Sequence, residues 1–200
     1  MINRGHLRFL AKNLALIGLL LMGGVPLLAQ DYVKYTSLED ALADPESVEY
    51  LKLRRNGYDE WPAELASFPN LKVLDLAHNK LKAIPYGLSY AEKLEELILT
   101  GNELDSLQSS IAQFTGLRKL LVGNNYIYHV SAQIEQLEQL EFFEIWSNET
   151  HYLPKEVGNL QALKEVDMRG IQISERHQDN IRSLFDESVT VKLSLSCNCD

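Results

Sequence analysis

The feature of this sequence that most constrains its fold is an internal repeat of 23 residues. Apolar residues recur at its first, fourth, sixth, eleventh, fourteenth, eighteenth and twenty-first places. A single segment of this length cannot cover its own apolar face, whereas stacked copies bury a continuous core. The sequence therefore predicts an array of six repeats over residues 48–185. Their first residues are Val48, Leu71, Leu94, Leu117, Leu140 and Leu163.

Two features of the repeat predict its local structure. The fourth and sixth places, such as Leu97 and Leu99, lie two residues apart, so on a strand they share one buried face. The third, fifth and seventh places then point the other way. The ninth place is asparagine in the first five repeats and Ile171 in the sixth, where the pattern breaks down. The five asparagines are Asn56, Asn79, Asn102, Asn125 and Asn148.

This pattern resembles the leucine-rich repeat family in its 23-residue form, whose second half carries an LPxxLxxL motif. Pro62, Pro85 and Pro154 keep the proline of that motif, while Gln108 and Ser131 replace it. The resemblance implies an α/β fold, a leucine-rich-repeat solenoid (a horseshoe arc) with a parallel β-sheet on its concave face. Loops and short helical turns would form the convex face. It also implies that the asparagines bond backbone groups where strand turns into loop, including those of the next coil.

The segment before the first repeat is predicted to close that end of the array, because an open coil exposes its core. Within this capping segment, residues 30–47, Ser37 begins a short helix with an acidic residue at its third position. We expect Leu38 and Leu42, four residues apart on that helix, to cover the first coil.

The last repeat is predicted to merge with a second capping helix. Ser174 begins this helix, which reaches about Phe185, and residues 186–200 form a terminal strand and a tail. The tail holds Cys197 and Cys199, which are too few for a disulfide framework and supply only half of a zinc site. They are interpreted as terminal thiols that export would expose to oxidation, and pairing between molecules stays open.

Residues 1–29 have the organisation of a secretory signal peptide. Three cations, Arg4, Arg8 and Lys12, precede an uncharged apolar run at residues 14–28. The run is shorter than the ~20 apolar residues that cross a bilayer core. An uncleaved signal anchor is the alternative. We expect a secreted, periplasmic or cell-surface protein with no stable membrane span after cleavage of the signal peptide.

The charge balance is acidic. The chain has 19 Lys+Arg against 28 Asp+Glu, a net charge of −9. Without the three cations of the leader, 16 cations face 28 anions, a net charge of −12. Such a surface repels phosphate backbones, so we expect no nucleic-acid partner.

Apolar side chains gather near the centre of the face formed by the third, fifth and seventh places. Adjacent strands lie ~4.8 Å apart, so neighbouring side chains at these places would form one patch. Isolated exposed apolar residues are common, whereas a cluster with Trp, Tyr and Arg is typical of an interface hot spot. We therefore expect recognition of another protein through the concave face. The candidate residues are Ile98, Leu121, Phe142, Trp146, Tyr50 and Arg54.

A second group of aromatic residues lies on the loop edge of repeats four and five. Such a rim would suit stacking on a sugar, so a carbohydrate- or cell-surface-binding module is the alternative function. Ordinary solvated loop side chains are the other interpretation. These residues are Tyr126, Tyr128, His129, His151 and Tyr152.

The catalytic alternative depends on two neighbouring carboxylates. Glu144 and Asp167 share the fifth place of adjacent repeats, near the ~5–5.5 Å spacing of a retaining glycosidase pair, and with Glu165 they would suit a calcium ion. No nucleophile motif or metal-ligand motif accompanies them. We therefore expect no enzyme activity, no cofactor and no metal. The sequon at Asn148 is not expected to carry a glycan, because Asn148 belongs to the buried asparagine column.

Overall fold

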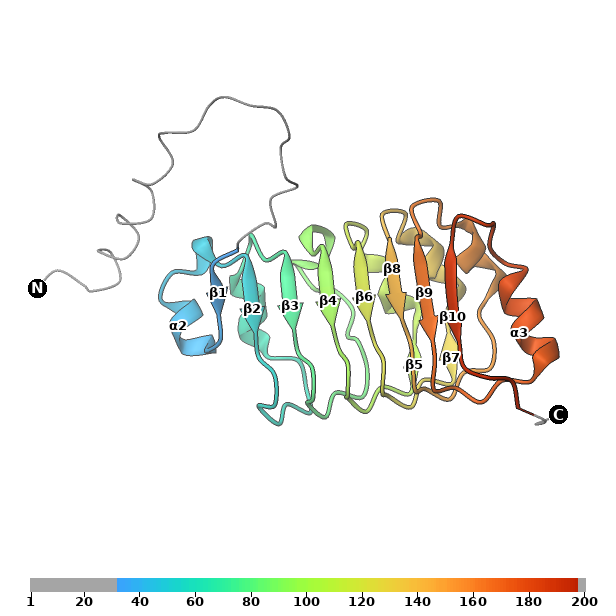
Figure 1. Ribbon diagram of the computed structural model, residues 1–200. Helices are drawn as coiled ribbons and strands as arrows, with labels where there is room; N and C mark the ends of the chain where they lie inside the picture. Colours follow the sequence, from blue (N-terminus) through green and yellow to red (C-terminus); the bar gives the residue numbers. More distant parts are fainter. Residues whose placement is uncertain (1–31, 198–200) are drawn as a thin grey trace, which may run out of the picture. The chain divides into compact units, whose positions relative to one another are not determined.

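The computed structural model describes residues 32–197 of the chain. The predicted signal peptide, residues 1–29, lies outside this range. In residues 32–197 the main sheet has eight parallel strands in the order β1-β2-β3-β4-β6-β8-β9-β10 (Figure 1). Because this order follows the chain, each coil adds one strand beside the previous one. This is the solenoid with a parallel sheet that the repeat predicts.

Six of the strands come from the same places of the six repeats. They pair residues 23 apart in the sequence, so that Leu74 lies between Leu51 and Leu97. The sheet continues at both ends with β1 (Lys34–Tyr35), which the sequence does not predict, and β10 (Thr190–Leu193), which it does. The six repeat strands are β2 (Tyr50–Lys52), β3 (Val73–Asp75), β4 (Glu96–Ile98), β6 (Lys119–Leu121), β8 (Phe142–Glu144) and β9 (Glu165–Met168).

Short 3-10 turns form the side of each coil that faces away from the sheet (Figure 1). The core lies between the sheet and these turns, and Leu97 and Leu99 at the fourth and sixth places are fully buried. A small second sheet, β5 (Ser106–Leu107) with β7 (His129–Val130), links the loops of repeats three and four. The turns are η1 (Pro45–Ser47), η2 (Ala63–Ser67), η3 (Ala91–Lys93), η4 (Ser109–Gln113), η5 (Ala132–Gln136) and η6 (Lys155–Asn159).

Four of the five asparagines form a buried column that ties the coils together. In Asn102, Oδ1 accepts a hydrogen bond from the N–H of Leu81 (3.1 Å), and Nδ2 donates to the carbonyls of Leu76 (3.1 Å) and Leu99 (2.8 Å). Leu76 and Leu81 belong to the preceding coil. The sequence predicts bonds to the next coil, and this prediction is wrong because the amide bonds the coil before it. The others that bond in the same way are Asn79, Asn125 and Asn148.

Asn56 does not belong to this column, which corrects the sequence prediction. Its side chain is exposed, and only its backbone N–H takes part, by donating to Oδ1 of Asn79 (3.0 Å). The physical reason is the direction of the bonds: the asparagine of the first repeat has no preceding repeat to reach. Asn148 is buried, and its Nδ2 donates to three carbonyls, so the nitrogen that a glycan would need is engaged.

Both predicted caps are present, with one error in detail. Helix α2 (Leu38–Leu42) begins at Ser37, whose hydroxyl accepts a bond from the Asp40 N–H (3.3 Å). Leu38 packs against the core, but Leu42 is 39% exposed, and Ala41 is fully buried in its place. Residues three apart share a face on this single helical turn, so Leu38 and Ala41 cover the first coil.

Helix α3 (Glu175–Arg182) closes the other end and stops short of the expected limit at Phe185. Ser174 precedes it, but its hydroxyl lies 3.2 Å from Nδ1 of His177 and makes no side-chain cap bond to the backbone. Cys197 is disulfide-bonded. No helix in the described part of the chain is both long and apolar enough to cross a membrane.

The eighth place of every repeat adopts a left-handed backbone conformation, with φ between 50° and 76°. The chain leaves the strand and enters the loop at this place. Glycine, which adopts positive φ without strain, fills only two of the six positions. The six residues are Arg55, His78, Gly101, Asn124, Ser147 and Gly170.

A row of alternating charge runs along the second place of the repeats, at the start of the strands. Lys72 Nζ lies 2.7 Å from Glu49 Oε1, and Glu141 accepts bonds from both Lys164 and Arg118. Opposite charges on neighbouring strands stabilise the register of a sheet. The residues of this row are Glu49, Lys72, Glu95, Arg118, Glu141 and Lys164.

Candidate functional site

The open face of the sheet carries the side chains of the third, fifth and seventh places. Ile98 and Leu121 occupy the fifth place of adjacent strands and lie opposite each other in the sheet register. Both are half-buried, unlike the fully buried leucines of the other face. The strand phase inferred from the sequence therefore matches the structure, and these two side chains form a contiguous apolar surface.

Trp146, at the seventh place of repeat five, lies over Gly123 of repeat four. A Cβ atom added at Gly123 would collide with Cε2 and Nε1 of the indole. The seventh place carries Ala77 in repeat two and Thr100 in repeat three, and both have a side chain where the ring would lie. Gly123 has none, so the sheet leaves room for the indole at this repeat. The indole is thus held against the sheet while remaining half-exposed.

Phe142 lies at the third place, in a different row from Ile98 and Leu121. Its strand partners are Lys119 and Glu165. The ammonium groups of Lys119 and Lys164 each lie 6.0 Å from the centre of its ring. The ring of Phe142 is therefore flanked by two cations, and cations are attracted to the face of an aromatic ring.

Tyr50 and Arg54 lie apart from the other four candidates. Strand β3 separates them from β4, and the residues of the same repeat on this face, Val73, Asp75 and Ala77, are buried. Arg54 Nε lies 3.6 Å from Asp75 Oδ1 and helps to cover it. The six residues proposed as one patch therefore fall into a central group and a separate pair near the first coil.

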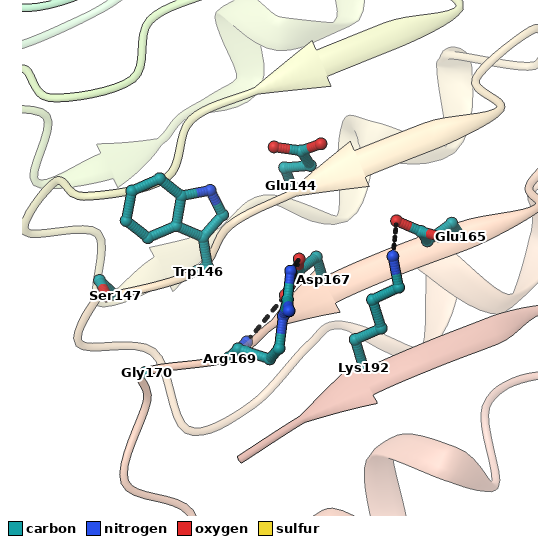
Figure 2. A pocket seen from close by; sticks show the side chains of 8 residues that line it. All are labelled: Glu144, Trp146, Ser147, Glu165, Asp167, Arg169, Gly170 and Lys192. Atoms are coloured by element: carbon teal, nitrogen blue, oxygen red, sulfur yellow. Dashed lines mark hydrogen bonds and ion pairs between the residues drawn. The ribbon is translucent and has the colours of Figure 1, made fainter.

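A shallow depression of about 320 Å³ lies beside Trp146, towards the last strands of the sheet (Figure 2). Two ion pairs line it. Lys192 Nζ lies 2.7 Å from Glu165 Oε1, and the guanidinium of Arg169 holds Asp167 through Nη2–Oδ2 (2.6 Å) and Nε–Oδ1 (3.0 Å). Its lining residues are Glu144, Trp146, Ser147, Glu165, Asp167, Arg169, Gly170 and Lys192.

Electrostatics at the depression keep Asp167 ionised. Burial by itself favours the neutral acid, but hydrogen bonds from the side chain and backbone of Arg169 hold the pKa of Asp167 below its ordinary value. Its carboxylate is therefore engaged and is not free to act as a nucleophile or a proton donor beside Glu144. Within residues 32–197 no group of three His, Cys, Asp or Glu side chains is placed to hold a metal ion.

The loop-edge tyrosines are strongly exposed, at 58% for Tyr126, 64% for Tyr128 and 60% for Tyr152. His129 and His151 are exposed as well. Tyr128 and His151 occupy the same place of successive repeats, and so do His129 and Tyr152. The structure thus places all five residues on one edge, in neighbouring coils.

Comparisons with known proteins agree with this geometry. The family model described as leucine rich repeat matches residues 46–104. A solved leucine-rich repeat protein of Leptospira interrogans aligns with 82% of this chain at a TM-score of 0.62 and 26% identity. Residues 46–104 therefore match the leucine-rich repeat family, and residues 32–197 have the leucine-rich-repeat fold. The family and the fold class predicted from the sequence are confirmed.

An internalin of Listeria monocytogenes aligns with 74% of this chain at a TM-score of 0.55 and 21% identity, a likeness of fold alone. The chain covers 49% of the Leptospira structure and 40% of the internalin, so it spans half the length of these proteins or less. No match was found among curated proteins.

Sequence reasoning missed two residues that shape the candidate surfaces. Gly123 admits the indole of Trp146, and a comparison of the seventh places would have singled out its missing side chain. His177 supports the loop edge: its ring packs against Tyr152 at 4.7 Å between centres, and its Nε2 lies 2.9 Å from the Tyr152 hydroxyl. His177 belongs to the capping helix, so no repeat spacing connects it with Tyr152.

Proposed function

We propose that this protein is exported and binds another protein through the open face of its sheet. The leucine-rich repeat fold itself favours protein–protein recognition. The observation that carries the proposal is the contiguous half-buried surface of Ile98 and Leu121, with Trp146 held over Gly123 nearby. A large aromatic ring and aliphatic neighbours that a partner can desolvate are the usual anchors of an interface.

The rigidity of the scaffold supports the same proposal. Trp146 is already held against the sheet, and the strands beneath it are hydrogen-bonded on both sides. Binding therefore costs little ordering entropy, and more of the contact energy appears as affinity. Ile98, Leu121, Phe142 and Trp146 form the proposed core of the interface, and Tyr50 and Arg54 a separate contact near the first coil.

The test is partner capture by a Leu121→Arg variant. Leu121 lies opposite Glu144, so the new guanidinium has a carboxylate beside it and the coil should stay folded. We expect this variant to lose a partner that the wild-type protein captures from its native source and that mass spectrometry identifies. Gln136→Arg, the same charge change at an exposed position of η5, is the control and should capture normally. Equal capture by Leu121→Arg and wild type would remove the sheet face from consideration.

Export is proposed from the first 29 residues alone, where a basic start precedes a short apolar run. The expected mature chain begins near Gln30 or Asp31. N-terminal sequencing of the protein from its native source measures this directly. An intact Met1 in the membrane fraction would instead identify a signal anchor.

Glycan binding at the loop edge is the second candidate, favoured by the exposure of Tyr126, Tyr128 and Tyr152. Exposed aromatic rings on neighbouring coils are suited to stacking on sugars. A glycan array should then give signals that Tyr128→Ala and Tyr152→Ala reduce. Signals absent from the array, or unchanged in both variants, count against this function.

A further inference from the structure

We propose that the depression beside Trp146 receives a basic side chain of the partner, with the indole of Trp146 against the cation and Glu144 as its counter-ion. This inference rests on the proposed function and names the chemistry of the partner at that surface. Glu144 is the last residue of β8 and Trp146 follows two residues later; Ile145 between them is buried in the core, so both side chains project from the open face of the sheet. Figure 2 shows them at the border of the depression.

The first argument is the charge of the depression. Three carboxylates and two cations line it, which leaves one negative charge. Asp167 is held by Arg169, and Glu165 is held by Lys192. The side-chain carboxylate of Glu144 makes no hydrogen bond or ion pair with any residue that the structure describes (Figure 2). The unbalanced charge therefore belongs to Glu144.

The second argument is the position of the indole. Gly123 lets Trp146 lie against the sheet, and the ring borders the depression with part of its surface exposed. An aromatic face attracts a cation, and Trp does so best among the aromatic side chains. An ammonium or guanidinium in the depression would meet the ring and the Glu144 carboxylate together.

Arginine fits these two groups better than lysine. Its planar guanidinium stacks on an aromatic ring and donates two parallel hydrogen bonds to one carboxylate, whereas an ammonium is a strongly hydrated point charge. An anionic ligand fits poorly, because Arg169 and Lys192 are already engaged with carboxylates and Glu144 would repel it. The occupant is therefore an arginine side chain of a protein partner.

The full chain contains two tryptophans, which gives the test an internal reference. Trp61 Nε1 donates to the carbonyl of Ala83 (2.9 Å), far along the sequence from the depression. The indole N–H signals of the folded protein are followed by NMR during titration with N-acetyl-arginine methylamide and, separately, with its neutral citrulline analogue. A Trp146→Phe variant assigns the signals.

We expect the arginine derivative to shift the Trp146 signal in a saturable way and to leave Trp61 unchanged, while the citrulline analogue shifts neither. Glu144→Gln should weaken this binding by about two- to fivefold, the range of an exposed ion pair, and Glu149→Gln on the adjacent loop should not change it. A thermal melt confirms that both variants are folded.

Three outcomes would overturn the inference: an unmoved Trp146 signal, equal shifts with citrulline, or unchanged binding by Glu144→Gln. None of these outcomes touches the proposed function, because the titration contains no partner protein. Loss of capture by Leu121→Arg would still support the sheet face in that case. Conversely, an arginine-dependent shift together with normal capture by Leu121→Arg would leave a cation site without the proposed interface.

Discussion

Replacement of Asn102 by alanine tests the interaction that links one coil to the next. The side chain is 5% exposed and makes three hydrogen bonds, two of them to the preceding coil. A net contribution of about 1 kcal/mol for each bond, with some rehydration of the backbone groups left behind, gives a loss of about 2–3 kcal/mol. For a domain of this size the melting temperature should fall by about 5–10 °C.

Urea unfolding followed by circular dichroism measures this loss, and Asn56→Ala is the matched control. Asn56 fills the same place of the first repeat, but its exposed side chain makes no hydrogen bond within the described residues. Its replacement should change stability by less than about 0.5 kcal/mol. If the two variants unfold at the same urea concentration as wild type, the amide column does not hold the coils together.

Three further changes have defined outcomes. Gly123→Ala should leave the melting temperature nearly unchanged, because the indole of Trp146 can rotate away from the added methyl group, while partner binding falls and tryptophan fluorescence changes. Ser37→Ala should cost about 1 kcal/mol in urea unfolding through loss of the helix cap, and Ser37→Asp should not. Hydrogen bonds from Lys164 and Arg118 lower the pKa of Glu141 from its ordinary value of 4.5. The ionised Glu141 therefore stabilises the folded protein above pH 4.5, and this stabilisation is lost as the pH falls through the lower pKa of the folded state. Melting curves of Glu141→Gln should therefore decline less steeply below about pH 4.5 than those of wild type, and parallel curves would contradict this.

The sequence predicts the fold well because one pattern is written six times. Leucines two residues apart define the buried face of every strand, and a side chain such as Leu121 is assigned to the open face by the same phase. An error in one repeat is corrected by the other five. The asparagine column is predicted for the same reason, and its direction fails only because spacing does not say which neighbour an amide reaches.

Features that depend on one coil alone could not be predicted in this way. Leu42 and Ala41 are adjacent in α2, and either could face the core. This single helical turn occurs once in the chain, so no repeat indicates which of the two side chains is buried. The contact of His177 with Tyr152 depends on where the capping helix docks. The left-handed eighth place recurs in every repeat, but the sequence does not reveal it because residues as different as Arg55 and His78 fill it. The surroundings of Trp146 are an exception, because a comparison of the seventh places would have singled out Gly123 one repeat earlier.

Because the charges at the second place alternate, the contact between neighbouring coils depends on whether an odd or an even number of coils is added or removed. Removal of one coil, residues 94–116, would bring Lys72 beside Arg118, and two cations would then share a neighbouring position where like charges repel. Removal of two coils, residues 94–139, would place Lys72 beside Glu141 and restore attraction. Gene duplications or deletions that change the copy number by two are therefore compatible with the electrostatics of this edge, whereas changes by one are penalised.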